Sequence, residues 1–127
     1  DEGAYIWRDL LNAGVVIASG TDAPVEPVSP IANFYAAITR KTLTGQPERG
    51  FEPEQKLTRL EALPSMTLAA AYAGFEEQSK GSIEVGKLAD LTVISQDLLT
   101  IPEARILQTE VTMTLVGGEV MYRREPQ

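Results

Sequence analysis

The sequence contains no histidine and no cysteine among its 127 residues. Imidazole and thiolate groups are the usual protein ligands of zinc, so the chain cannot build a conventional zinc site from its own residues, and we expect no metal to bind to it alone. The same absences exclude a Ser-His-Asp triad and a disulfide framework. A chain without cysteine suits a reducing compartment, and we expect the protein to be cytoplasmic.

Positive charge and long apolar runs are also scarce. Eleven Lys and Arg face eighteen Asp and Glu, which gives a net charge of −7. Nucleic-acid phosphates would be repelled by such a surface, so we expect no nucleic-acid partner. No apolar run approaches the roughly 20 residues that span a bilayer, and the acidic opening at residues 1–3 is unlike a signal peptide, so we expect no membrane partner.

What is present describes a globular protein. The chain is 43% hydrophobic and 23% charged, and its length suits one modest core. The first residue is Asp1 rather than Met, and a helical pattern follows within a few residues. We therefore expect the N-terminus to be a cut made inside a longer protein.

The first quarter of the chain resembles one helix-strand unit. Apolar residues at helical spacing predict a helix near residues 3–13, which Gly14 ends. The continuous apolar run at 15–18 predicts a strand that is covered on both faces, as in a parallel sheet. Prolines at 24, 27 and 30 exclude regular structure directly after this strand.

Helices dominate the middle of the sequence. Ser29 is a suitable N-cap and Pro30 a suitable first residue for a helix that reaches about residue 43. A Gly- and Pro-rich surface loop at 44–57 follows. Thr58 and Glu61 then have the spacing of a capping box, and the helix that they open should end or kink at Pro64. A further helix is expected at 67–73.

The last third changes to short strands. Alternating apolar residues on either side of a Gly-Gly pair are typical of a β-hairpin. We expect strands at 83–85, 91–94, 111–116 and 119–122, and a short helical turn at 102–106.

Asp22 is the candidate site residue. It follows the predicted buried strand in a turn that prolines restrain. In β/α barrels the active site lies at this end of the strands, and a carboxylate there can bind a metal or accept a proton from water. The alternative is that its side chain only accepts backbone hydrogen bonds in an Asx-type turn, and the residue pattern alone favours this alternative. Glu26 lies in the same loop and is expected to be solvated.

Five segments together resemble the amidohydrolase superfamily, nearest to the branch called amidohydrolase family 3, which includes N-acyl amino acid deacylases. GTDAP at 20–24 is similar to the loop after the eighth barrel strand. LTRLEAL at 57–63 and TLAAAYA at 67–73 resemble the helices that follow it. GSIEVGKLADL at 81–91 and VGGEVMY at 116–122 resemble parts of the side domain of the family.

The resemblance implies an α/β architecture. Residues 1–77 would be the last strand and helices of a (β/α)8 metal-dependent hydrolase barrel. Residues 78–127 would be the C-terminal part of a β-sandwich side domain. The chain is thus expected to be a C-terminal fragment whose principal partner is the missing N-terminal part of the same protein.

The resemblance also implies a reaction. In the intact enzyme a divalent metal, usually zinc, would activate water that attacks an amide or other C–N bond of a small-molecule substrate. Asp22 would be the catalytic residue and also a metal ligand, together with histidines from the missing part of the chain. The isolated chain is expected to be inactive.

Two other functions stay open at this point. The chain could be a non-catalytic binding or regulatory module, or a subunit that completes a split hydrolase with a histidine-bearing chain. We also expect self-association as a symmetric dimer, because the strand at 15–18 and the hairpin at 111–122 would lack sheet partners.

Overall fold

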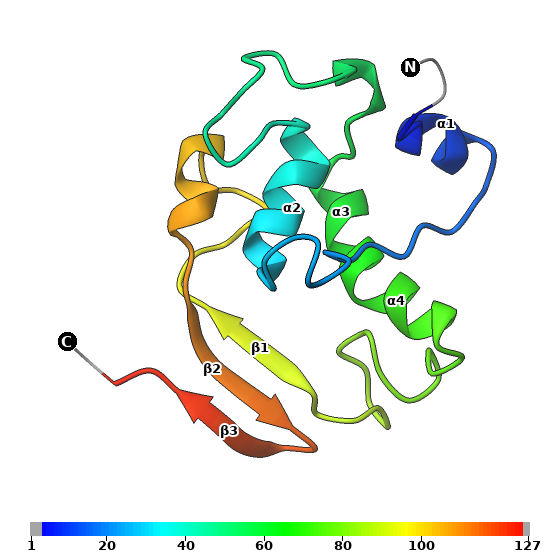
Figure 1. The fold of residues 1–127 in the computed structure, drawn as a ribbon. Helices are drawn as coiled ribbons and strands as arrows, with labels where there is room; N and C mark the ends of the chain where they lie inside the picture. The colour runs from blue at the N-terminus through cyan, green and yellow to red at the C-terminus, as the bar shows by residue number, and fades with distance from the viewer. Residues whose placement is uncertain (1–3, 126–127) are drawn as a thin grey trace.

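The computed structural model describes residues 4–125 and combines helices with a small sheet, as predicted. In Figure 1 the sheet lies below the helices, which surround the central helix α2. Within residues 4–125, no helix has the length and apolar character needed to cross a membrane. In chain order the elements are α1 (Trp7–Asn12), α2 (Pro30–Thr39), the 3-10 helix η1 (Pro53–Gln55), α3 (Arg59–Met66), α4 (Leu68–Ala73), β1 (Leu91–Ile94), the 3-10 helix η2 (Glu103–Gln108), β2 (Val111–Val116) and β3 (Glu119–Arg123).

Helix α2 begins as the sequence predicts. The Ser29 hydroxyl accepts a hydrogen bond from the backbone N–H of Ala32 at 3.2 Å, and Pro30 is the first helical residue. The helix ends at Thr39, before the predicted end at residue 43, because Arg40 adopts a left-handed conformation with φ 56°.

The capping box that opens α3 is also confirmed. The Glu61 carboxylate accepts the backbone N–H of Thr58 at 2.7 Å. Pro64 lies inside α3, which ends two residues later at Met66. Helix α4 starts at Leu68, so the two helices follow one another with a single intervening residue (Figure 1). The predicted break thus occurs slightly after the proline.

The core lies where α2, α3 and η2 meet. Phe34 from α2, Ala62 from α3 and Ile106 from η2 are fully buried there. Leu98 belongs to the same cluster, so residues from both predicted segments, 1–77 and 78–127, contribute to one core. The division between those segments remains a prediction.

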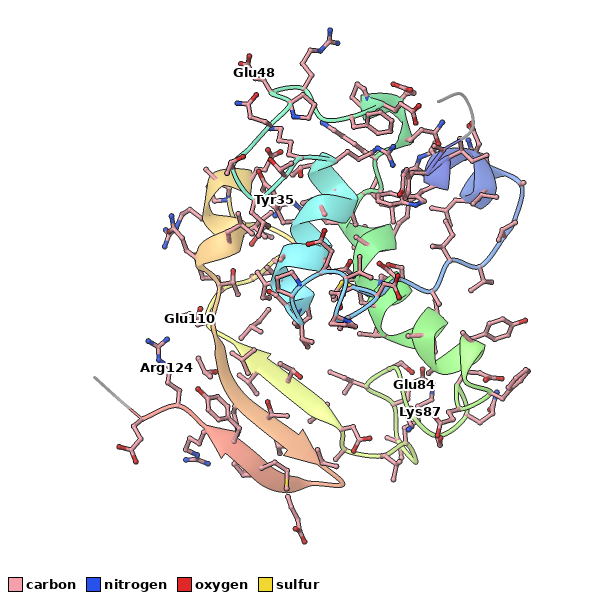
Figure 2. The ribbon with its side chains drawn as sticks, in the orientation of Figure 1. Tyr35, Glu48, Glu84, Lys87, Glu110 and Arg124 are labelled. Atoms are coloured by element: carbon pink, nitrogen blue, oxygen red, sulfur yellow. The ribbon has the colours of Figure 1, made fainter. Side chains whose placement is uncertain are left out.

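The sheet is antiparallel, in the order β1-β2-β3. The predicted hairpin forms, and both turn glycines, Gly117 and Gly118, have the positive φ that a tight turn between twisted strands requires. Arg124 forms an ion pair with Glu110 across the open end of the hairpin (Figure 2). The expectation that this hairpin lacks a partner is wrong, because β1 pairs with β2 along its whole length.

Two predicted strands are absent. Residues 15–18 and 83–85 all lie in the described part of the chain, and neither segment forms a strand there. A strand covered on both faces needs neighbouring strands, and within residues 4–125 none lies beside 15–18. The 83–85 segment instead leads into a turn in which Nζ of Lys87 lies 3.5 Å from Oε1 of Glu84 (Figure 2). The predicted first helix is shorter than expected, and its predicted start at residue 3 lies outside the described residues.

A large apolar surface stays uncovered. The chain exposes 8673 Å², whereas a folded monomer of this mass exposes about 6,600 Å². Exposed apolar side chains occur on β2 and β3, on α4 and in the loop around Ile83, which is 89% exposed. Self-association was expected because a strand at 15–18 and the hairpin at 111–122 would lack sheet partners, and neither condition is met in the structure. The symmetric dimer is still a prediction, and the exposed apolar surface is now the argument for it.

An ion pair fastens α1 to the rest of the molecule. Nη1 and Nη2 of Arg8 donate to Oε1 and Oε2 of Glu61, each at 2.6 Å. Nη2 of Arg8 also donates to the Lys56 carbonyl at 2.8 Å. Hydrogen bonding to Arg8, reinforced by Thr58, lowers the pKa of Glu61 to about 2.

Replacing Glu61 with glutamine should therefore destabilise the protein in a pH-dependent way. A depressed carboxyl pKa stabilises the fold above the unfolded value, here 4.5, and this stabilisation is lost as the pH falls toward about 2. The pair is partly solvated, so we expect a cost of about 1 kcal/mol at pH 7. Urea unfolding of both proteins should give stabilities that converge between these two pH values. A constant difference down to pH 2 would contradict the assignment.

Candidate active-site loop

The Asp22 loop, residues 19–29, joins the segment after α1 to the start of α2. At its first residue, the backbone N–H of Ser19 donates to the Ser65 carbonyl of α3 at 2.9 Å. The Ser19 hydroxyl accepts from the side-chain amide of Asn33 on α2, also at 2.9 Å. At its last residue, Ser29 caps α2. Both ends of the loop are therefore bonded to helices.

Asp22 lies between these anchors, with an exposed side chain. Its backbone is left-handed, with φ 52°, and its carbonyl accepts the N–H of Val25 at 2.8 Å. Within residues 4–125 the structure records no hydrogen bond or ion pair to its carboxylate. The Asx-turn alternative is thus wrong, because the carbonyl rather than the side chain accepts the turn hydrogen bond.

The surroundings of Asp22 are apolar and acidic. Val25 and Val28 are 73% and 81% exposed, and Glu26 is exposed as expected. The sequence has no lysine or arginine between Arg8 and Arg40, so no basic residue of this segment offsets the charge of Asp22. Aspartate adopts a left-handed backbone more readily than most residues other than glycine, and such conformations are concentrated at functional sites. The free carboxylate can accept a proton or bind a cation.

A metal site needs more donors than this loop provides. Among the described residues, no group of three Asp or Glu side chains is placed to hold a metal ion. A single carboxylate does not fit a divalent ion by itself, so the described residues do not make a metal centre. Asp22 is the sequence-predicted site residue, and among residues 4–125 it belongs to no such group of three.

A shallow open groove lies elsewhere, between α3 and the segment that follows β1. Its apolar lining residues are Leu63, Ile94, Leu98 and Leu99, and no residue of the Asp22 loop takes part. The groove contains one acidic residue, Asp97, whose carboxylate accepts from the Leu99 N–H and the Thr100 hydroxyl. Its chemistry is that of a structural turn.

Arg40 is an interaction centre that the sequence analysis did not identify. Its side chain is 3% exposed and lies over the rings of Trp7 and Phe51, at 4.6 and 5.2 Å from the ring centroids. It donates to the Tyr5 carbonyl at 2.8 Å, and burial lowers the pKa of its guanidinium. No local pattern could have revealed it, because its partners are distant in sequence. Its role is to hold the N-terminal segment against α2.

Comparison with known proteins matches this chain to a family. The family model described as "Amidohydrolase family" matches residues 2–122. The protein YtcJ of Bacillus subtilis (strain 168), whose name assigns it to the amidohydrolases, is 32% identical over 95% of this chain and 23% of its own length. The N-substituted formamide deformylase of Arthrobacter pascens is 33% identical over 92% of this chain and 21% of its own length.

A solved structure agrees in fold. An amidohydrolase from Thermotoga maritima MSB8 superposes with a TM-score of 0.71 at 24% sequence identity, over 94% of this chain and 26% of that chain. This chain thus spans about a quarter or less of the length of these proteins. The match over residues 2–122 covers the Asp22 loop, the helices after it and the hairpin. The chain belongs to the amidohydrolase family.

Proposed function

We propose that this chain is the C-terminal part of a hydrolase that cleaves an amide or other C–N bond with water, and that Asp22 is its contribution to the active site. The family match across residues 2–122 carries this proposal. The exposed, unpaired carboxylate of Asp22 on an anchored loop supports it. The deformylase from Arthrobacter pascens makes small N-substituted formamides the first substrates to test.

Asp22 would act as a proton carrier. Its carboxylate would accept a proton from the attacking water and return that proton to the amine nitrogen as the C–N bond breaks. A carboxylate in this role must be accessible to the substrate and must not already be hydrogen-bonded to another protein group. The Asp22 carboxylate meets this condition, because no described residue forms a recorded hydrogen bond or ion pair with it and its side chain is exposed.

Metal dependence belongs to the proposal as well. A divalent ion, zinc in our prediction, would supply the activation of water in the intact enzyme. The described residues do not hold such an ion by themselves, so its histidine ligands would come from outside this chain. The proposed contribution of this chain is the carboxylate of Asp22. The isolated chain would accordingly be inactive.

The proposed architecture places residues 1–77 in a (β/α)8 barrel and residues 78–127 in a β-sandwich. The apolar run at 15–18 supports the first part, because it would become a strand beside neighbours supplied by the rest of the protein. The uncovered apolar surface supports both parts. About 2,000 Å² of excess exposed area is comparable to what a large permanent interface buries.

Removal of metal tests the proposal. We expect the intact protein to release amine and formate from N-substituted formamides, and a chelator to lower this rate at least about a hundredfold. Added zinc should restore the rate. The matched control is the same chelator already saturated with zinc, which should have no effect. Full activity in protein that metal analysis shows to be metal-free would refute the metal-dependent mechanism.

A further inference from the structure

One turn of α2 holds both ends of the Asp22 loop. Asn33 donates from its side-chain amide to the Ser19 hydroxyl at 2.9 Å, and from its backbone N–H to the Ser29 carbonyl at 3.0 Å. Ser29 in turn accepts from the N–H of Ala32 at 3.2 Å. The Asp22 loop is therefore closed at its base, like other compact surface loops whose two ends lie close together.

The loop has little else to order it. Its prolines carry no N–H group, and its valines are exposed rather than packed. Between the two anchors, the recorded backbone hydrogen bond runs from Val25 to the Asp22 carbonyl. The position of the Asp22 carboxylate thus depends on the anchors at the base of the loop.

The side chain of Asn33 is not part of the buried apolar core. Its neighbour Phe34 is fully buried, whereas Asn33 is half-buried and its amide donates to Ser19. Asparagine is also a poorer helix former than alanine, because its side chain competes with backbone hydrogen bonds. For the stability of α2 alone, alanine would be the better residue at position 33.

From these contacts we propose that Asn33 is a positioning residue for Asp22. Through Ser19 it fixes the loop in the conformation that presents the carboxylate to the substrate. This inference rests on the proposed function, because it assumes that the Asp22 carboxylate acts on the substrate.

Hydrogen exchange of the intact protein tests the physical part of the inference. In the Asn33→Ala variant, the Val25 N–H, which donates the recorded backbone hydrogen bond within residues 20–28, should exchange about threefold to tenfold faster, as expected for the loss of one hydrogen bond. Peptides from the interior of α2 should exchange as before. Ser19→Ala should have the same effect, whereas Ser19→Thr keeps the hydroxyl and should leave exchange unchanged. Unchanged exchange of the Val25 N–H in both alanine variants would overturn the proposal.

Kinetics with an N-substituted formamide tests the functional part. Asn33→Ala should lower kcat about tenfold with little change in KM, because a poorly positioned group loses rate rather than binding. In an Asp22→Asn background the same change should cost nothing further. Asn12→Ala, an exposed asparagine in α1, is the matched control.

The outcomes separate the two proposals. If Asp22→Asn leaves kcat unchanged, the proposed function fails. If Asp22→Asn is slow but Asn33→Ala is as fast as the parent, only the positioning role fails. An equal loss from Asn33→Ala in both backgrounds would show that Asn33 acts independently of Asp22, and would also overturn the inference.

Discussion

Replacing Asp22 with asparagine should lower kcat of the intact hydrolase about a hundredfold to ten-thousandfold. Asparagine keeps the size of the side chain and can still accept a hydrogen bond, but it cannot take up a proton from water near neutral pH. The loss should appear in kcat more than in KM, because the proton moves only as the transition state forms. Steady-state kinetics with an N-substituted formamide measures both constants.

Glu26→Gln is the matched control for this prediction. Glu26 lies in the same exposed loop, four residues further along, and the same neutralisation there should leave kcat within about twofold, as for most surface substitutions. A large loss at Glu26 with none at Asp22 would reassign the carboxylate. Equal losses at both positions would indicate a general effect of loop charge and would contradict a specific role for Asp22.

Local signals in the sequence were enough to predict the elements that need few distant partners. Ser29 with Pro30 and Thr58 with Glu61 specify where α2 and α3 begin, because each cap bonds groups within a few residues. The Gly117-Gly118 turn specifies the hairpin in the same way. The position of Asp22 in a proline-rich loop was also predictable.

The features that depend on distant residues were not predictable in this way. The apolar run at 15–18 indicates a buried strand, yet a strand forms only beside another strand, and the described residues provide none there. The clamps made by Arg8 and Arg40 join groups that lie dozens of residues apart, so no spacing rule reveals them. The hydrogen bond from Asn33 to Ser19 also joins two separate elements, and it was missed for the same reason.

Truncation of Phe34 should have the largest effect on stability. Phe34 is fully buried at the centre of the core, and its replacement by alanine leaves a cavity that should cost about 3–5 kcal/mol. A single domain is stable by only about 5–15 kcal/mol, so this variant should be close to unfolding. Urea unfolding followed by circular dichroism measures the loss.

Phe75→Ala provides the matched control, because it makes the same chemical change at a side chain that is 95% exposed. It should alter the stability by no more than about 0.5 kcal/mol. Phe34→Leu keeps most of the volume and should cost about 1.5 kcal/mol or less, which keeps the core testable if the alanine variant does not fold. The order of stability should therefore be Phe75→Ala, then Phe34→Leu, then Phe34→Ala. A Phe75→Ala variant as unstable as Phe34→Ala would contradict this order. It would mean that another segment of the intact protein covers Phe75, and that burial of Phe75 stabilises the fold as strongly as burial of Phe34 does.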